Sequence, residues 1–62
     1  MAKHLYEQYQ PGDLVEIQFG GDERWWRGRV MHHASPGIWV QTTNGQFWFV
    51  TNTRRIRPVV KV

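Results

Sequence analysis

The 62-residue chain contains no cysteine, so neither a disulfide bond nor a thiolate metal site can contribute to its stability. Its longest apolar run is too short to cross a membrane, and no signal-peptide core is found near its start. A chain of this size buries only about 60% of its unfolded surface, so it allows one small domain that depends on close packing. We therefore expect a soluble, cytoplasmic domain that carries no cofactor and binds no membrane.

Acidic residues are missing from the second part of the chain, because all five of them precede residue 24. From Arg24 onward the only charged residues are Arg and Lys, and the whole chain has a net charge of +3. A surface of one sign attracts anionic partners, among which nucleic acid is the first to consider. The alternative is that these charges only keep the domain in solution.

Four tryptophans are a large number for so short a chain. Trp25 and Trp26 stand between arginines, whereas Trp39 and Trp48 stand between apolar residues. A core this small cannot enclose four indole rings, so some of them lie at the surface. Aromatic faces beside guanidinium groups form a binding surface there. The sequence thus indicates a small β-domain that binds a partner.

Alternating apolar residues between turn signals predict five short strands. Gly28, in the middle of the second strand, indicates a bend or a close approach of the backbone. Asn44-Gly45 predicts a type I′ hairpin turn, and residues 51–55 interrupt the strand pattern with a short 3₁₀ turn. The strands are expected at residues 14–19, 24–32, 38–42, 46–51 and 56–57.

The inward positions of these strands predict the core of a domain over residues 11–58, followed by a tail at 59–62. Residues 1–10 have no clean period, so they form either a frayed N-terminal arm or a short turn that lays Leu5 and Tyr6 on the domain. Every position of 47–50 is apolar, so alternation leaves the inward face of that strand open. The predicted core consists of Val15, Ile17, Val30, Ile38, Val40, Val50 and Ile56.

Five strands, a tight third hairpin and a helical turn before the last strand describe an all-β, SH3-like small barrel. Over about residues 11–58 the sequence resembles the Tudor/agenet group of these barrels. The matching segments are Pro11-Gly12-Asp13-Leu14-Val15-Glu16-Ile17, Trp26-Arg27-Gly28-Arg29-Val30 and Val50-Thr51-Asn52-Thr53-Arg54-Arg55-Ile56-Arg57-Pro58. The opening Gly-Asp-x-Val is also similar to the KOW barrels of transcription and ribosomal proteins, although the later glycines of that motif are missing.

Tudor barrels often hold methylated lysine or arginine in an aromatic cage. The resemblance places two cage positions on Phe19 and Trp26, and the other two near Gln41 and Asn44, which are not aromatic. Because cation–π capture depends on several rings around one cation, the resemblance implies only a partial cage. The alternative is that Phe19 and Trp26 close the mouth of the barrel.

Arginine and tryptophan side chains are expected to share the outward face of the second and third strands, where antiparallel neighbours meet. Single-stranded nucleic acid needs such a surface, because phosphates bind guanidinium groups and each base stacked on an indole contributes roughly 1–3 kcal/mol. The alternatives are a ladder of side chains that only covers the sheet, or a contact with a second copy or a partner protein. We call Trp25, Arg27, Arg29, Trp39 and Gln41 the Arg/Trp face.

Arg54, Arg55 and Arg57 surround the helical turn and would extend this face as a basic track whose phosphate contacts depend on salt. The alternative is a solvated basic edge. Arg57 is also expected to pair with either Glu16 or Asp13.

Residues for metal or covalent chemistry are few. His32 and His33 are adjacent, so on a strand they face opposite ways, and no nearby cysteine or acid completes a zinc site. Ser35 is the single serine and precedes a proline in a turn, and no acid pair is placed for general acid–base work.

The sequence therefore predicts a non-enzymatic module that binds nucleic acid with low sequence specificity. The alternative is a Tudor-like protein-interaction or self-assembly module that binds a peptide or a second copy of itself. The compact format suits a small accessory protein, such as those of phage or mobile elements.

Overall fold

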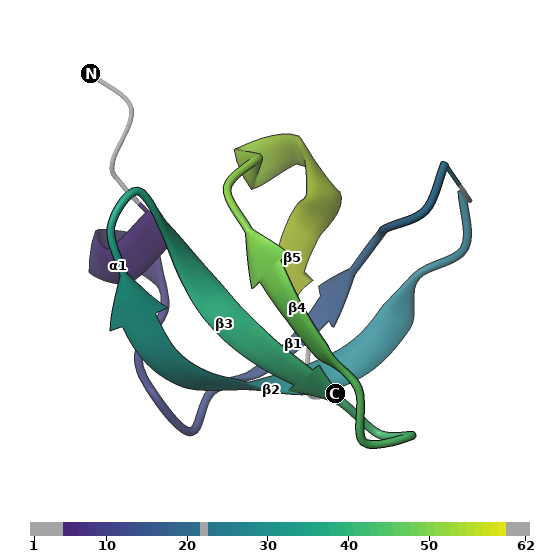
Figure 1. Ribbon diagram of the computed structural model, residues 1–62, viewed down its shortest axis with the longest axis horizontal. Helices are drawn as coiled ribbons and strands as arrows, with labels where there is room; N and C mark the ends of the chain where they lie inside the picture. The colour runs from purple at the N-terminus through teal and green to yellow at the C-terminus, as the bar shows by residue number, and fades with distance from the viewer. Residues whose placement is uncertain (1–4, 22, 60–62) are drawn as a thin grey trace.

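The computed structural model describes residues 5–21 and 23–59 as one antiparallel sheet of five strands in the order β4-β3-β2-β1-β5 (Figure 1). No helix in these residues is long and apolar enough to cross a membrane. The elements are α1 (Leu5–Gln8), β1 (Leu14–Ile17), β2 (Trp26–Ala34), β3 (Gly37–Thr42), β4 (Phe47–Val50), the 3₁₀ turn η1 (Thr53–Arg55) and β5 (Ile56–Pro58).

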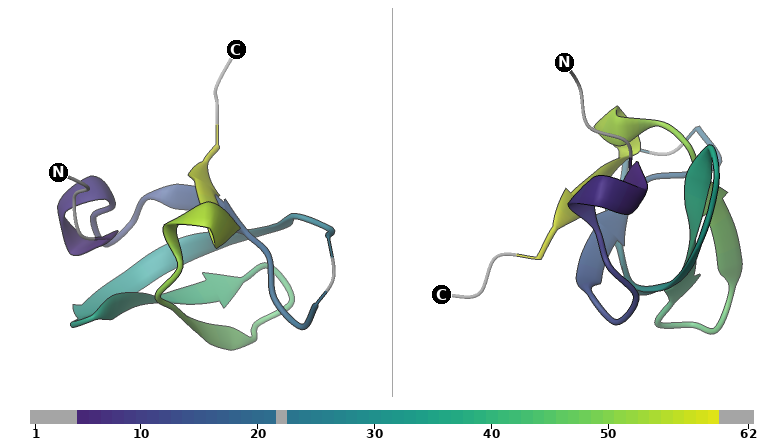
Figure 2. Two further views of the ribbon diagram at one scale, coloured as in Figure 1. Left: turned by 90° about the horizontal axis from the view of Figure 1, so that it is seen from above. Right: turned by 90° about the vertical axis from the view of Figure 1, so that its left-hand side faces the viewer.

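The sheet is strongly curled, as the right-hand view of Figure 2 shows. Its two outermost strands, β4 and β5, do not pair with each other, so within the described residues the sheet stays open between them. The prediction of five antiparallel strands with a 3₁₀ turn before the last one is confirmed. A closed barrel is not formed by this part of the chain.

The core contains every residue that alternation placed there. In β1, for example, Val15 and Ile17 are fully buried, whereas the alternate residues Leu14 and Glu16 are not. On β4 the question left open by the sequence is settled, because Val50 is buried and Phe47 and Phe49 are exposed. The core prediction of Val15, Ile17, Val30, Ile38, Val40, Val50 and Ile56 is confirmed.

Residues 5–9, for which the sequence left open a frayed arm or a short turn against the domain, contribute to the core. Leu5 is 2% exposed and Tyr9 is buried beside it. The Tyr9 N–H donates to the Leu5 carbonyl over 3.0 Å, and His33 Nε2–H of β2 donates to the Tyr9 carbonyl over 2.7 Å. The first bond closes the single helical turn of α1, and the second ties the segment to the sheet. The Tyr6 side chain lies outside what the structure describes, as do the tail residues 60–62.

Two strand boundaries differ from the prediction. β1 ends at Ile17 rather than Phe19, because Ile17 is the last residue paired with β2 and the chain then turns at two glycines with positive φ. β2 begins at Trp26 and continues past His32 to Ala34, since β3 pairs with it to its end. A bulge between Val30 and His32 shifts the register by one residue.

The β3–β4 hairpin does not contain the expected type I′ turn. That turn needs positive φ at both Asn44 and Gly45, but only Gly45 has one, at 88°. The Gly45 N–H donates to the Thr42 carbonyl (2.9 Å), and the Thr42 N–H donates to the Gln46 carbonyl (2.8 Å). The loop therefore has three residues and ends with glycine in the left-handed region, an arrangement that an Asn-Gly pair also permits.

The expected close backbone approach at Gly28 is confirmed. A Cβ at this buried position would lie 2.7 Å from Val40 Cγ1 and 2.8 Å from the Gln41 carbonyl oxygen. Gly28 thus lets β3 cross close to β2 at the point where the sheet bends.

Gly28→Ala is expected to lower the free energy of unfolding by about 1–3 kcal/mol, because the added methyl group overpacks the contact between β2 and β3. Urea unfolding monitored by tryptophan fluorescence measures the loss. Met31→Ala on the same strand removes an exposed side chain and should change stability by less than about 0.5 kcal/mol. Equal stability of Gly28→Ala and the wild type would show that this approach does not limit the sheet.

Candidate nucleic-acid interface

Arg27 and Arg29 lie on β2 on either side of Gly28, and both are exposed on the outer face of the sheet. Arg29 is between Leu14 of β1 and Gln41 of β3, and Arg27 is opposite Glu16 of β1. The predicted neighbours Arg29 and Gln41 are therefore direct cross-strand partners.

Aromatic rings gather where β2, β3 and β4 continue past Arg29. Trp39 is opposite His32 on one side and Phe49 on the other, with ring centroids 6.3 Å and 5.1 Å away. Phe47 is opposite Gln41. Phe47 and Phe49 are 54% and 40% exposed, so these rings are accessible. We call His32, Trp39, Phe47 and Phe49 the aromatic end of the outer face.

Sequence analysis missed the two phenylalanines as candidate site residues. The run Phe47–Val50 is apolar throughout, so period-2 alternation carries no information there. A usable signal was the pairing partner, because Trp39 was assigned outward and an antiparallel neighbour at the same register position must face the same way.

Trp25 lies at the other end of the outer face and does not join Trp39 in one platform. Arg57 Cζ is 4.0 Å from the centroid of the Trp25 ring, a cation–π contact. Arg57 Nε also donates to Glu16 Oε1 over 2.8 Å, so the expected partner is Glu16 rather than Asp13. The order along the outer face is thus Trp25, just before β2, then Arg27 and Arg29 of β2, and then the aromatic end.

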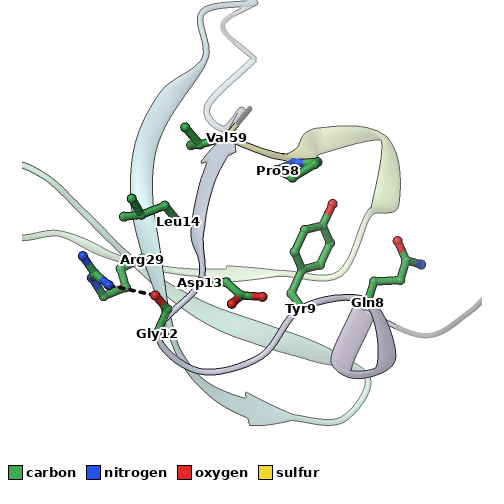
Figure 3. Close-up of a pocket in the computed structure, with 8 residues that line it drawn as sticks. All are labelled: Gln8, Tyr9, Gly12, Asp13, Leu14, Arg29, Pro58 and Val59. Carbon is green, nitrogen blue, oxygen red and sulfur yellow. Dashed lines mark hydrogen bonds between the residues drawn. The ribbon is translucent and has the colours of Figure 1, made fainter. Parts of the chain in front are cut away.

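Local contacts hold Arg29 but not the side chain of Arg27. Arg29 Nη1 donates to the Gly12 carbonyl over 2.7 Å, as Figure 3 shows. For the Arg27 side chain, residues 5–21 and 23–59 provide no hydrogen bond or ion pair. Arg27 is therefore the guanidinium on this face that can turn toward a ligand without breaking a contact.

Arg54 and Arg55 are exposed on η1, away from β2 and β3. The Arg54 N–H donates to Asn52 Oδ1 over 2.9 Å, which caps the turn. Arg55 borders a cavity of about 190 Å³ between β4 and the end of β1. The structure does not bring these two arginines onto the outer face with Arg27, whereas Arg57 does lie there.

Phe19 and Trp26 do not surround an open cage. Phe19 lies almost flat on Trp48, with centroids 3.9 Å apart and planes at 15°, and it stacks on Trp26 at 5.6 Å and 27°. Arg24 Cζ is 5.1 Å from the Trp26 centroid on the same stack. Gln41, near a third cage position, is opposite Arg29 on the other side of the sheet from this stack.

We call Trp26, Phe19 and Trp48 the aromatic stack. Its rings pack against the core, in agreement with the alternative that they close the mouth of the curled sheet. The Nε1–H groups of Trp26 and Trp48 are buried with no hydrogen-bond partner among the described residues. Each unpaired donor costs about 1–3 kcal/mol, so the stacking persists against this cost.

A hollow of about 840 Å³ lies between α1 and the β1–β5 side of the sheet (Figure 3). Among the predicted site residues only Arg29 borders it. Tyr9 lines the hollow, and burial raises the pKa of its phenol above 10.0. No group of three His, Cys, Asp or Glu residues that could hold a metal ion occurs in the part of the chain that the structure describes.

Comparisons of this chain with protein-family models, with curated proteins and with solved structures found no match.

Tyr9→Phe is expected to reduce the loss of stability at alkaline pH. Because the pKa of Tyr9 is raised in the folded state, its contribution is complete below the unfolded pKa of 10.0 and is lost as the pH rises toward the folded pKa. Urea unfolding at about pH 8 and about pH 11 measures this. The wild type should lose more free energy of unfolding than the variant, and identical losses would contradict the burial of an un-ionised phenol.

Proposed function

We propose that this domain is a non-enzymatic module of the SH3-like small-barrel type that binds single-stranded nucleic acid across its outer face with little sequence preference. The observation that carries the proposal is the order of side chains along β2. Arg27 and Arg29 lie between an aromatic ring at one end, Trp25, and the aromatic end at the other.

The charge of this face supports an anionic ligand. Glu16 is the acidic residue that the strands contribute to this face, and its carboxylate is already paired with Arg57. Arg27 and Arg29 therefore remain as unneutralised cations at the centre of the face. Guanidinium groups bind phosphate oxygens with strong, geometrically defined hydrogen bonds.

The exposed rings supply the second part of such a site. A base is a flat ring with a π-face on both sides, so it stacks on Phe47, Phe49 or Trp39 whatever its identity. Stacking and phosphate contacts carry little sequence information, whereas hydrogen bonds to base edges do. On this face Gln41 is the amide that could read a base edge, which is consistent with weak sequence preference.

Arg27→Ala should weaken binding to a short fluorescent oligo-dT and reduce the slope of log K against log salt by about 0.7, the value for one phosphate contact on a single strand. Fluorescence anisotropy over a range of salt concentrations measures both quantities. The loss should be similar for mixed-sequence strands, because a phosphate contact is common to all of them.

Arg24→Ala is the matched control, because it removes the same charge at the aromatic stack rather than on the outer face. It should change the affinity much less than Arg27→Ala. Equal effects of the two variants would mean that net charge alone attracts the strand, and the site assignment would then be wrong. Absence of binding at low salt would dismiss the function itself.

A further inference from the structure

The two edges of the open sheet are unequal. On the β5 side, Arg55 and Val59 bond to β1 through Gln18 N–H→Arg55 O (2.9 Å) and Val59 N–H→Leu14 O (3.2 Å). Alternation then turns the peptide groups of Ile56 and Pro58 toward the free side. Proline has no N–H to donate, so this edge is protected against pairing with another strand.

The β4 edge lacks this kind of protection. The bond from the Thr42 N–H to the Gln46 carbonyl shows which residues of β4 direct their main-chain groups toward β3. By alternation, the N–H and C=O groups of Phe47 and Phe49 point away from β3, toward the free side. No other strand within residues 5–21 and 23–59 pairs there, and β4 contains neither proline nor a charged residue.

The hairpin that carries this edge is also uncharged, although Arg55 of η1 borders the same cavity as Phe49. Between Arg29 and Arg54 the chain has no Asp, Glu, Lys or Arg, so the whole β3–β4 hairpin lacks ionic groups. Natural edge strands usually carry such groups to prevent association. The net charge of +3 therefore comes from residues outside this hairpin.

We infer that β4 pairs antiparallel with β4 of a second copy of this chain, which joins two sheets into one across a two-fold axis. Antiparallel pairing of a strand with itself is self-complementary and closes at the dimer. An axis through Trp48 places Phe47 opposite the partner's Phe49, and the two residues exchange both main-chain hydrogen bonds. The protected β5 edge of another copy is a poorer partner.

Such a dimer leaves the outer face accessible. Side chains stand perpendicular to a sheet, so the phenylalanine rings would meet in the middle of a continuous outer face with an arginine stripe on each side. Self-pairing does not rest on the nucleic-acid proposal, because it uses main-chain groups of the edge and is measured without any oligonucleotide.

Sedimentation velocity from about 1 µM to about 500 µM tests self-pairing. The mass should rise from monomer to dimer with concentration. Phe49→Lys keeps an exposed site exposed and adds a charge to the edge, and it should raise the dimer dissociation constant by at least about tenfold. Met31→Lys adds the same charge to an equally exposed apolar residue on β2, away from the edge, and should leave the constant within about threefold.

Amide hydrogen exchange separates edge pairing from packing of the two outer faces. The Phe47 and Phe49 amides should exchange slowly at high concentration and fast at low concentration. Strict monomers at every concentration, a dimer in which these two amides stay fast, or equal dissociation by Met31→Lys would each overturn the inference. Circular dichroism of the variants confirms that they are folded, and anisotropy with oligo-dT reports separately on nucleic-acid binding.

Discussion

This structure depends on one constraint: a short chain must bury a small set of aliphatic side chains. The described residues supply no second layer to cover a flat sheet, so the sheet bends until its inward residues pack against each other. The bend depends on close crossing of β2 and β3 at Gly28. A second close approach lies at the start of β3, where a Cβ at Gly37 would collide with the Val50 carbonyl. At both positions a side chain would collide with a neighbouring strand, so the strands can pack this closely only where glycine is present.

Because the sheet covers its own inner side, its outer side is left uncovered by the part of the chain that the structure describes. Polar and aromatic residues must therefore occupy positions that a larger domain would bury under a helix. The arginines of β2 and the rings of β3 and β4 occupy this uncovered side, with Glu16 and Arg57 joined across two strands. Curvature thus explains both the core and the location of the candidate interface. It also explains why the aromatic stack is needed at the open end, where β4 and β5 stay apart.

The sequence predicted those parts of the fold that depend on local alternation. Val15 and Ile17 could be placed because polar residues separate them, and Gly28 because a glycine inside a strand commonly marks a bend or a close approach of two backbones. Leu5 was placed on the domain in only one of two alternatives and Tyr9 in neither, since the residues that hold this segment, such as His33, are distant in sequence. The Asn44-Gly45 pair led to the wrong turn type, because two types of hairpin loop accept the same pair of residues.

The candidate site was predicted in part for the same reason. Arg29 and Gln41 follow from pairing two consecutive strands, but the separation of Trp25 from Trp39 depends on where β2 begins and on the bulge at Met31. Phe19 was aligned to a cage position, and its stacking on Trp48 involves a strand whose facing the sequence left undecided.

The position of β1 between β2 and β5 has a consequence for how the chain reaches this structure. β5 must pair with β1, and the Glu16–Arg57 pair between these strands spans 41 positions of a 62-residue chain. Contacts of such long range delay folding, because most of the chain must be ordered before they form. The domain should therefore fold in milliseconds or longer as a single cooperative unit, and a nascent chain that lacks β5 should not yet hold its native sheet.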